Sequence, residues 1–266
     1  MKVLELIKSH RSVRQYKSDK IDRKLLNTIL EAGCRASTTG NMQLYSIVIT
    51  EKEDMKATLA PLHFNQKAVL EAPTLLTICA DFNRFKKWCQ FRDAKPGFDN
   101  FLSFMNAAVD AILVSQNIAL AAESEGLGIC YFGTVLYNAE SIIEALNLPK
   151  GVVPVAALTM GYPVSTPSQT DRLPLEAIVH EEEYKDYNLE RINKFYSTKE
   201  AHSESVRFVI DNNKTTLAQV FTDVRYKQSD NELFSRRFFE VLKNQGFLEE
   251  SLAEVLMQDP FVTVER

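Results

Sequence analysis

The longest segment with a helical pattern, residues 98–125, is the feature that most constrains the fold of this chain. We predict one long helix over this segment, with apolar residues on almost every face between Val109 and Ala122. A helix of this kind must be covered all round. In a chain of 266 residues, the simplest cover is a sheet on one side and a partner subunit on the other. The segment therefore predicts a layered fold and a dimer.

We do not expect the same segment to cross a membrane. Its most apolar part, residues 107–122, is shorter than the roughly 20 residues that a bilayer span needs, and Asp110, Gln116 and Asn117 interrupt it. Residues 1–16 carry scattered charges and no long apolar core, so they predict neither a signal peptide nor a transit peptide. We expect a cytoplasmic protein with no membrane partner.

Charge and cysteine usage argue against a nucleic-acid-binding protein and against a metal-binding or disulfide-bonded protein. A net charge of -4 and a pI near 5.7 give no general attraction to a phosphate backbone, so nucleic acid is not an expected partner. The 4 cysteines occur singly, and the 4 histidines form no ligand-like spacing with them. We therefore predict free thiols and no metal.

The hydrophobic pattern alternates between helix and strand. Helices are predicted at 3–7, 25–30, 51–62, 139–146 and 231–244, and strands at 45–50, 75–80, 129–132 and 152–160. Gly126 and Gly128 are expected to end the long helix through a glycine cap. Beyond Pro174 the chain becomes polar and charged. The pattern predicts an α+β or α/β sandwich in which helices flank a central sheet.

The first segment that could carry chemistry is 10–14, with the sequence His-Arg-Ser-Val-Arg. Arginine holds phosphate through paired N–H donors, so two guanidiniums and a hydroxyl are enough to seat one phosphate and part of a polar chain. A solvated basic helix end that interacts favourably with the helix dipole explains the same residues. The segment alone leaves both interpretations open.

The second segment is 37–43, a run of short hydroxyl and amide side chains ahead of a predicted strand. It could donate several hydrogen bonds to a heterocycle or a ribityl chain. Ser, Thr, Asn and Gly also dominate ordinary turns for backbone reasons, so an ordinary turn with a helix cap remains an alternative.

The third segment is 128–134, a predicted strand that runs into a Tyr-Phe-Gly-Thr turn. A glycine in such a turn lets backbone N–H groups approach a flat ring closely. A plain strand end is the alternative interpretation.

The fourth segment combines the break at 161–163 with Asp-Arg-Leu-Pro at 171–174. An arginine held there could complete a phosphate site. It could equally pair with a surface carboxylate, and the sequence alone does not decide between these two interpretations.

Taken together, the order and spacing of the four segments resemble the nitroreductase family, most closely its NADPH-dependent oxygen-insensitive nitroreductases and flavin reductases. The resemblance covers about residues 2–185 and implies an α+β fold with a central, mostly antiparallel sheet flanked by helices and a helical C-terminal extension. It implies an FMN-binding core at 1–185 and a helical, polar extension at 186–266. It also implies a homodimer that holds FMN at the subunit interface.

The resemblance assigns FMN contacts to individual residues. His10, Arg11 and Ser12 would hold the phosphate and the ribityl chain, and Arg172 would add a second guanidinium at the phosphate. Arg14 would lie beside the N1 and C2 carbonyl edge of the ring, where a fixed cation stabilises the negative charge that reduction creates.

Further contacts are implied for the other segments. Ser37, with Thr39 and Asn41 nearby, would come from the partner subunit, and Gln66 would bond the N3 and O4 edge. Backbone N–H groups would line the ring near N5 at three positions: Tyr131, Gly133 and Thr134.

The chain departs from the family pattern in places. Thr170 stands where the family often has lysine, which removes one cation from the phosphate site. Thr134 stands where a glycine is common, which narrows the approach to N5. Leu44 and Tyr45 stand where the family often has Pro-Trp, so the loop before them is expected to pack differently.

No residue in these segments resembles a nucleophile with its base, so no catalytic side chain is assigned and the chemistry is expected on FMN N5. We predict a ping-pong cycle in which NADPH or NADH delivers hydride and a nitroaromatic, quinone or flavin substrate is then reduced. The alternatives are a flavin-binding carrier or sensor without turnover, which Thr134 would favour by blocking N5, and a scaffold without cofactor.

Overall fold

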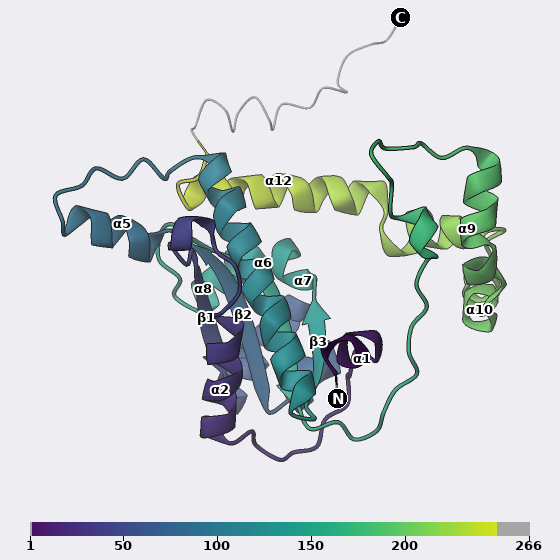
Figure 1. Ribbon diagram of the computed structural model, residues 1–266, viewed down its shortest axis with the longest axis horizontal. Helices are drawn as coiled ribbons and strands as arrows, with labels where there is room; N and C mark the ends of the chain where they lie inside the picture. Colours follow the sequence, from purple (N-terminus) through teal and green to yellow (C-terminus); the bar gives the residue numbers. More distant parts are fainter. Residues whose placement is uncertain (1, 249–266) are drawn as a thin grey trace, which may run out of the picture. The chain divides into compact units, whose positions relative to one another are not determined.

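The computed structural model describes residues 2–248, which form two compact units (Figure 1). The first unit combines Met1–Ser168 with the segment that begins at Phe234, and the second comprises Gln169–Leu233. The last part of the predicted extension, residues 249–266, lies outside the described residues. The functional division of the chain at residue 185 stays a prediction.

The first unit is built on a four-stranded sheet, and all its strand pairs are antiparallel. The strands are β1 (Tyr45–Thr50), β2 (Thr74–Asp81), β3 (Gly128–Phe132) and β4 (Val152–Gly161). Their order across the sheet is β1-β2-β4-β3, so β3 is an edge strand. The predicted α+β class with a central antiparallel sheet is confirmed.

Helices surround this sheet. The α-helices of the first unit are α1 (Val3–Lys8), α2 (Arg23–Gly33), α3 (Glu53–Leu59), α4 (Lys67–Glu71), α5 (Asn83–Gln90), α6 (Phe101–Ser124), α7 (Thr134–Tyr137) and α8 (Ala139–Ala145), and the 3₁₀ turns are η1 (Thr39–Asn41) and η2 (Ala60–His63). The hydrophobic pattern predicts neither α4, α5 nor α7. Helices α4 and α7 have only 5 and 4 residues, so they offer little periodicity to detect.

The sheet separates two hydrophobic cores. Leu76 and Ile78 of β2 face the core beneath α2 and α6, whereas Leu75 faces the core beneath α3 and α8. A bulge where Ile78 and Cys79 pair with β4 sets Val155 and Leu158 on the same face, although they are three positions apart. Side chains of β4 therefore alternate between the two faces of the sheet on both sides of the bulge, and the apolar residues stay on the face toward α2 and α6.

The predicted long helix is α6, and both of its ends are capped. The side chain of Asn100 accepts a hydrogen bond from the N–H of Ser103 at 3.0 Å. At the other end, Gly126 has a φ of 77°, and Leu127 donates its N–H to the carbonyl of Ala122 at 3.0 Å. This is the hydrogen-bond pattern of a Schellman motif, so the glycine cap is confirmed.

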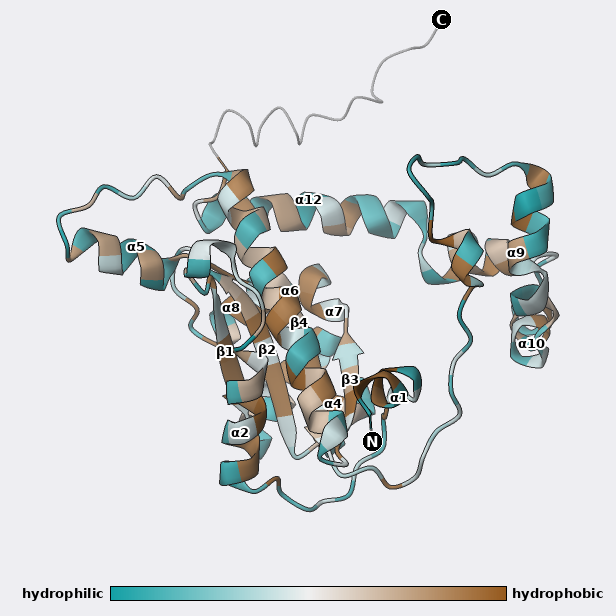
Figure 2. Cartoon of the chain, viewed as in Figure 1, coloured by the Kyte–Doolittle hydropathy of each residue, from teal (hydrophilic) through white to brown (hydrophobic). Residues whose placement is uncertain are grey.

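One face of α6 packs against α2 and all four strands, and the other face is open to solvent. Figure 1 shows α6 lying across the sheet. Leu102, Val109 and Ile112 are 69%, 49% and 53% exposed. Figure 2 shows hydrophobic residues along much of the helix. The predicted sheet contact is therefore present, and within residues 2–248 much of the opposite apolar face is exposed.

Among residues 2–248, α6 is also the one helix whose length and composition would allow a membrane span. Half of its most apolar window is buried within the protein, with a share of 50%. Its buried face includes Asp110, which is 1% exposed. These properties match the core helix of a folded domain rather than a helix surrounded by lipid.

The second unit is helical, as the resemblance implies. It contains η3 (Leu175–Ala177), α9 (Leu189–Ala201), α10 (Ser203–Asp211), α11 (Leu217–Val220) and η4 (Phe221–Arg225), and α12 (Gln228–Asn244) begins there. The later part of α12 belongs to the first unit, where Phe238 packs against Phe104 of α6 with ring centroids 5.8 Å apart.

Candidate functional site

The segment that contains Ser12 and Arg14 extends the sheet beyond β3. Ser12 pairs in parallel with Ile129, and Val13 donates its N–H to the Ile129 carbonyl at 2.8 Å. The contact is close because residue 128 is glycine: a Cβ there would lie 2.6 Å from the Cβ of Val13. The sequence-predicted basic segment therefore lies along the edge strand rather than on a free helix end.

Arg14 lies beside Cys130 of β3. Burial raises the pKa of the Cys130 thiol, and the adjacent Arg14 guanidinium partly opposes that effect. Val13 of the same segment is buried in the hydrophobic core that also contains Cys130. Arg14 itself is exposed, so it presents a cation at the outer edge of the sheet.

His10 and Arg11 line a cavity of about 220 Å³ at the C-terminal end of α6. The His10 Nδ1 lies 2.5 Å from Oε1 of Glu123, and Arg11 donates to the Ser9 carbonyl at 2.8 Å. Further hydroxyl groups reach this cavity from Ser165 and Thr166, which follow β4. The donors are of the kind that hold a phosphate, and Glu123 orients the histidine.

The second predicted segment is held by a buried carboxylate on α6. Asp110, which is 1% exposed, accepts from the hydroxyl of Thr38, from the N–H and the hydroxyl of Thr39, and from the N–H of Leu44. Ser37 and Asn41 of the same loop are exposed. The loop is thus a fixed turn that presents polar side chains, not a loose connection.

The end of β3 is open. The hydroxyl of Tyr131 donates to Ser115 Oγ of α6 at 3.1 Å, and burial raises the pKa of this tyrosine. Gly133 follows the strand, and a Cβ built on it would meet nothing within 4 Å. Arg14 lies beside Cys130, and Gly133 follows three residues later, directly after the end of β3.

Thr134 follows Gly133, and its side chain contacts the buried His63. Its hydroxyl lies 2.8 Å from Nδ1 of His63, and its side chain is buried at 9% exposure. Gln66, three residues after His63, is exposed at the start of α4. His63 itself is 0% exposed, and burial lowers its pKa to about 4.

Arg172 lies in the second unit. It donates to Thr170 Oγ1 at 2.9 Å and to the Asp171 carbonyl at 2.9 Å, and it lines a cavity of about 590 Å³ together with Lys199. Lys199 forms an ion pair with Asp171 at 3.1 Å. Thr170, which stands in place of a family lysine, therefore interacts with the arginine directly. The contact of Arg172 with FMN phosphate stays a prediction.

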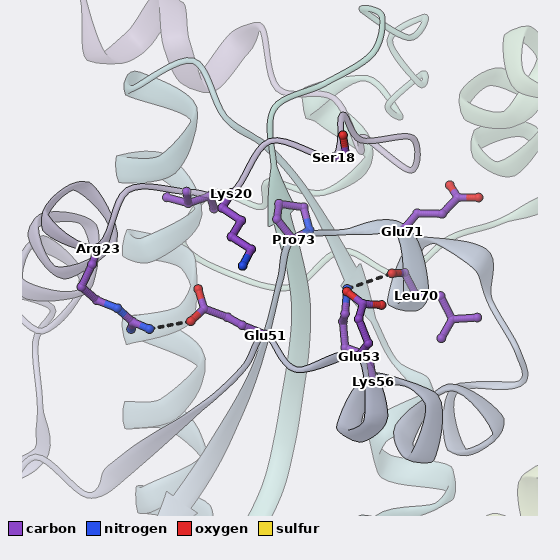
Figure 3. A pocket seen from close by; sticks show the side chains of 10 residues that line it. Ser18, Lys20, Arg23, Glu51, Glu53, Lys56, Leu70, Glu71 and Pro73 are labelled. Atoms are coloured by element: carbon purple, nitrogen blue, oxygen red, sulfur yellow. Dashed lines mark hydrogen bonds and ion pairs between the residues drawn. The ribbon is translucent and has the colours of Figure 1, made fainter.

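A separate cavity of about 340 Å³ lies between the start of α2, the end of β1 and α3 (Figure 3). Four of its charged side chains form two ion pairs: Arg23 with Glu51 at 2.5 Å and Lys56 with Glu53 at 2.8 Å. Buried Lys56 also donates to the Leu70 carbonyl at 2.9 Å and so supports α4. The residues predicted to bind FMN do not line this cavity.

The predicted residues of the first unit fall into two groups along α6. The first group lies near the C-terminal end of the helix, where His10 contacts Glu123, and the loop of Thr39 is fixed at Asp110. At the rise of an α-helix, the 13 residues between Asp110 and Glu123 span about 20 Å. One chain therefore holds the two groups well apart.

Sequence reasoning missed three residues that support predicted site residues: Asp110, Glu123 and His63. The signal for Asp110 is a carboxylate within the most apolar segment of the chain, since a buried charge requires partners. Glu123 and His63 carry no comparable signal, because neither stands out from its neighbours until the fold is known.

Comparison with known proteins gives this arrangement a family. The nitroreductase family model matches residues 7–162, more than half of the chain. The chain belongs to the nitroreductase family. The matched residues include the basic segment, the Thr39 loop and all four strands, so the predicted resemblance is confirmed.

Individual relatives agree with this assignment. The oxygen-insensitive NADPH nitroreductase of Salmonella typhimurium is 36% identical over 68% of this chain and 74% of its own length. An FMN reductase [NAD(P)H] of Bacillus subtilis is 35% identical over 68% of this chain and 74% of its own length. A solved structure from Bacteroides fragilis has a TM-score of 0.91 and 51% identity, covering 92% of this chain and 100% of its own.

Proposed function

We propose that this nitroreductase is one subunit of a cytoplasmic homodimer that uses FMN and NADPH or NADH to reduce nitroaromatics, quinones or free flavin. The family and the relatives named NADPH nitroreductase and FMN reductase support an FMN-dependent NAD(P)H oxidoreductase. One observation carries the site: Ser12 and Arg14 lie along edge strand β3, which ends at the open backbone of Gly133.

The side chains present fit FMN by their chemistry. Arg11, Ser12 and His10 supply the guanidinium, hydroxyl and imidazole groups that bind a phosphate and a ribityl chain. Arg14 presents a second cation beside Cys130 of β3, where it would stabilise the negative charge of a reduced ring. The open space over Gly133 leaves room for a flat ring against the backbone.

Hydride acceptance and release is the chemistry that bound FMN supplies. Arg14 would lie beside the N1 and C2 edge of the ring and stabilise the charge that reduction creates there. The backbone N–H groups of Tyr131, Gly133 and Thr134 would line the N5 edge, and Gln66 would donate to the N3 and O4 edge. These residues position the ring and adjust its reduction potential without forming a covalent bond to it. The nicotinamide and the oxidised substrate then use the same open face in turn, in a ping-pong order.

The dimer is supported by the exposed apolar face of α6. The family resemblance implies that Ser37 and Asn41 reach the ring from a second copy of the chain. The exposed apolar stripe that includes Leu102, Val109 and Ile112 supplies a surface on which two copies can pack. A stable interface of this kind buries on the order of 2,000 Å².

Thr134 no longer supports the carrier alternative. That interpretation requires the threonine to project over N5 and block it. Its side chain is instead buried, and its hydroxyl is bound to His63 at 2.8 Å. Turnover is therefore favoured over storage of the cofactor.

Gly133→Ala tests the site. The added methyl meets no protein atom within 4 Å, so folding is unchanged, but it occupies the space assigned to the ring. We expect at least tenfold weaker FMN binding, measured by quenching of flavin fluorescence. Gly97→Ala is the matched control, because its added methyl also meets nothing within 4 Å.

The wild-type protein should bind FMN and oxidise NADPH in the presence of a nitrofuran or a quinone. Failure to take up FMN would overturn the proposed function. If Gly133→Ala instead binds FMN as tightly as the wild type and the Gly97→Ala control, the ring does not lie against Gly133.

A further inference from the structure

His63 is buried in the wall beneath the proposed ring site. Its side chain is 0% exposed, and its Nδ1 lies 2.8 Å from the hydroxyl of Thr134. The imidazole also meets the ring of Phe132 edge-on, with centroids 5.7 Å apart. The bond joins two segments far apart in the sequence: the end of η2, just before Gln66, and the first residue of α7, just after Gly133.

Two more contacts join the same two segments. The side-chain amide of Asn138 donates to the Leu62 carbonyl at 2.7 Å. The ring of Phe64 packs against the ring of Tyr137, with centroids 6.2 Å apart. The α7 segment therefore holds the loop before Gln66 at several points, and the contact of His63 with Thr134 reaches the turn itself.

The loop that His63 precedes has an unfavourable backbone conformation. Phe64 and Asn65 have φ values of 55° and 52°, in the left-handed region that side chains other than glycine rarely adopt. Such residues persist only where surrounding contacts impose the conformation, and they concentrate at functional sites. Loss of the contacts to α7 should let this loop relax and move Gln66.

The second ring nitrogen of His63 points to a role other than simple packing. Nε2 is buried and has no hydrogen-bond partner within the described part of the chain. A buried polar atom without a hydrogen-bond partner destabilises the folded protein, so such atoms are rare. Burial also lowers the pKa of His63 to about 4, so the ring is neutral at neutral pH and can orient Thr134 without adding charge near the flavin.

We propose that His63 is a positioning residue: by binding the Thr134 hydroxyl, it fixes the Gly133–Thr134 turn and the Gln66 loop in the arrangement that receives FMN. This inference rests on the proposed function, since it takes both segments to contact the ring. It also explains how this chain accommodates threonine where glycine is common in the family. The threonine hydroxyl is drawn away from the ring toward the histidine.

The test compares variants that break the bond with variants that keep it. His63→Leu and Thr134→Val each remove one partner, whereas His63→Asn keeps a polar atom at the place of Nδ1 and Thr134→Ser keeps the hydroxyl. FMN affinity is measured by fluorescence quenching, and the visible spectrum of the flavin is recorded at saturation. We expect His63→Leu and Thr134→Val to weaken FMN binding about fivefold to tenfold, as for the loss of one buried hydrogen bond, and to shift the spectrum.

His63→Asn and Thr134→Ser should recover most of the affinity and the wild-type spectrum. The double variant His63→Leu/Thr134→Val should lose little more than either single variant, because both remove the same bond. Ile142→Val, in the same hydrophobic core, is the control for general destabilisation and should leave the spectrum unchanged.

The outcomes separate the two proposals. If wild-type protein binds no FMN, the proposed function fails. If wild-type protein binds FMN and His63→Leu and Thr134→Val bind it with the same affinity and spectrum, the positioning role fails while the function stands. Additive losses in the double variant would also overturn the role, because they would mean that the two side chains act separately.

Discussion

Asp110 accepts two hydrogen bonds from Thr39 through one carboxylate oxygen, from the backbone N–H at 2.9 Å and from the hydroxyl at 3.0 Å. Its other oxygen accepts from Thr38 and from the N–H of Leu44. The buried charge is thus matched by donors from one loop. Helix α6 thereby fixes the loop that we expect to reach the partner's FMN.

Asp110→Asn should destabilise the protein. The amide nitrogen that replaces one oxygen would face donors instead of accepting from them. We expect a loss of about 2 to 3 kcal/mol in the free energy of unfolding, measured by urea denaturation of the FMN-free protein. Asp99→Asn, at an exposed aspartate, is the control. Equal stability of Asp110→Asn and wild type would mean that the carboxylate does not hold the loop.

The sequence predicts the apolar strands and α6 well because their pattern is local. The strand predicted at 45–50 has the same bounds as β1, and the predicted long helix exceeds α6 by a few residues at its N-terminal end. Helix α5 is missed although Phe85, Trp88 and Cys89 recur at helical spacing, because its eight residues include several basic side chains and form only about two turns. Phe85 of α5 packs edge-on against Phe82 and Phe98, and such contacts form only in the fold.

The candidate site is predictable only in part for the same reason. The types of donor at Arg11, Ser12 and Arg14 are visible in the sequence, and they suggest a phosphate and a ring. The residues that hold these donors are not visible, because Thr39 and Asp110 are 71 positions apart and His10 and Glu123 are 113 apart. Sequence patterns indicate which groups are present, while the fold determines which of them meet.

Gly128→Ala should displace the basic segment. The new Cβ would lie 2.6 Å from the Cβ of Val13, so the segment that carries Ser12 and Arg14 must move off β3. We expect FMN affinity to fall at least tenfold, measured by fluorescence titration. Gly246→Ala is the control, since its φ of 80° makes that substitution unfavourable while its methyl meets nothing within 4 Å. The control should lose about 1 kcal/mol of stability and keep its FMN affinity; a similar loss of affinity in both variants would contradict the prediction.

Ile112→Lys should prevent dimer formation. Ile112 is 53% exposed in the apolar stripe of α6, and a lysine there would place a charge in the proposed interface. Light scattering after size-exclusion chromatography should give a monomer, and FMN affinity should fall because Ser37 of a second copy is no longer available. Leu70→Lys, at a leucine that is 43% exposed on α4, should remain a dimer. A dimer of Ile112→Lys with full FMN affinity would place the interface elsewhere.

His63 should make the stability of the protein depend on pH. Burial lowers its pKa from 6.5 to about 4 in the folded protein. Below pH 6.5 the unfolded chain binds a proton at this histidine, whereas the folded protein does not bind it until the pH nears 4. The free energy of unfolding therefore falls as the pH drops from 6.5 toward 4, and it is fully recovered above 6.5. The shift corresponds to about 3 kcal/mol over the whole interval.

His63→Asn removes the titrating ring while keeping a polar atom beside Thr134, so it isolates this effect. Urea denaturation from pH 7 down to about pH 5 should show a smaller loss of stability in the variant than in the wild type, by about 2 kcal/mol at the lower pH. His202→Asn, at an exposed histidine that caps α10, is the matched control. Parallel curves for the wild type and His63→Asn would mean that the imidazole is not held neutral by burial.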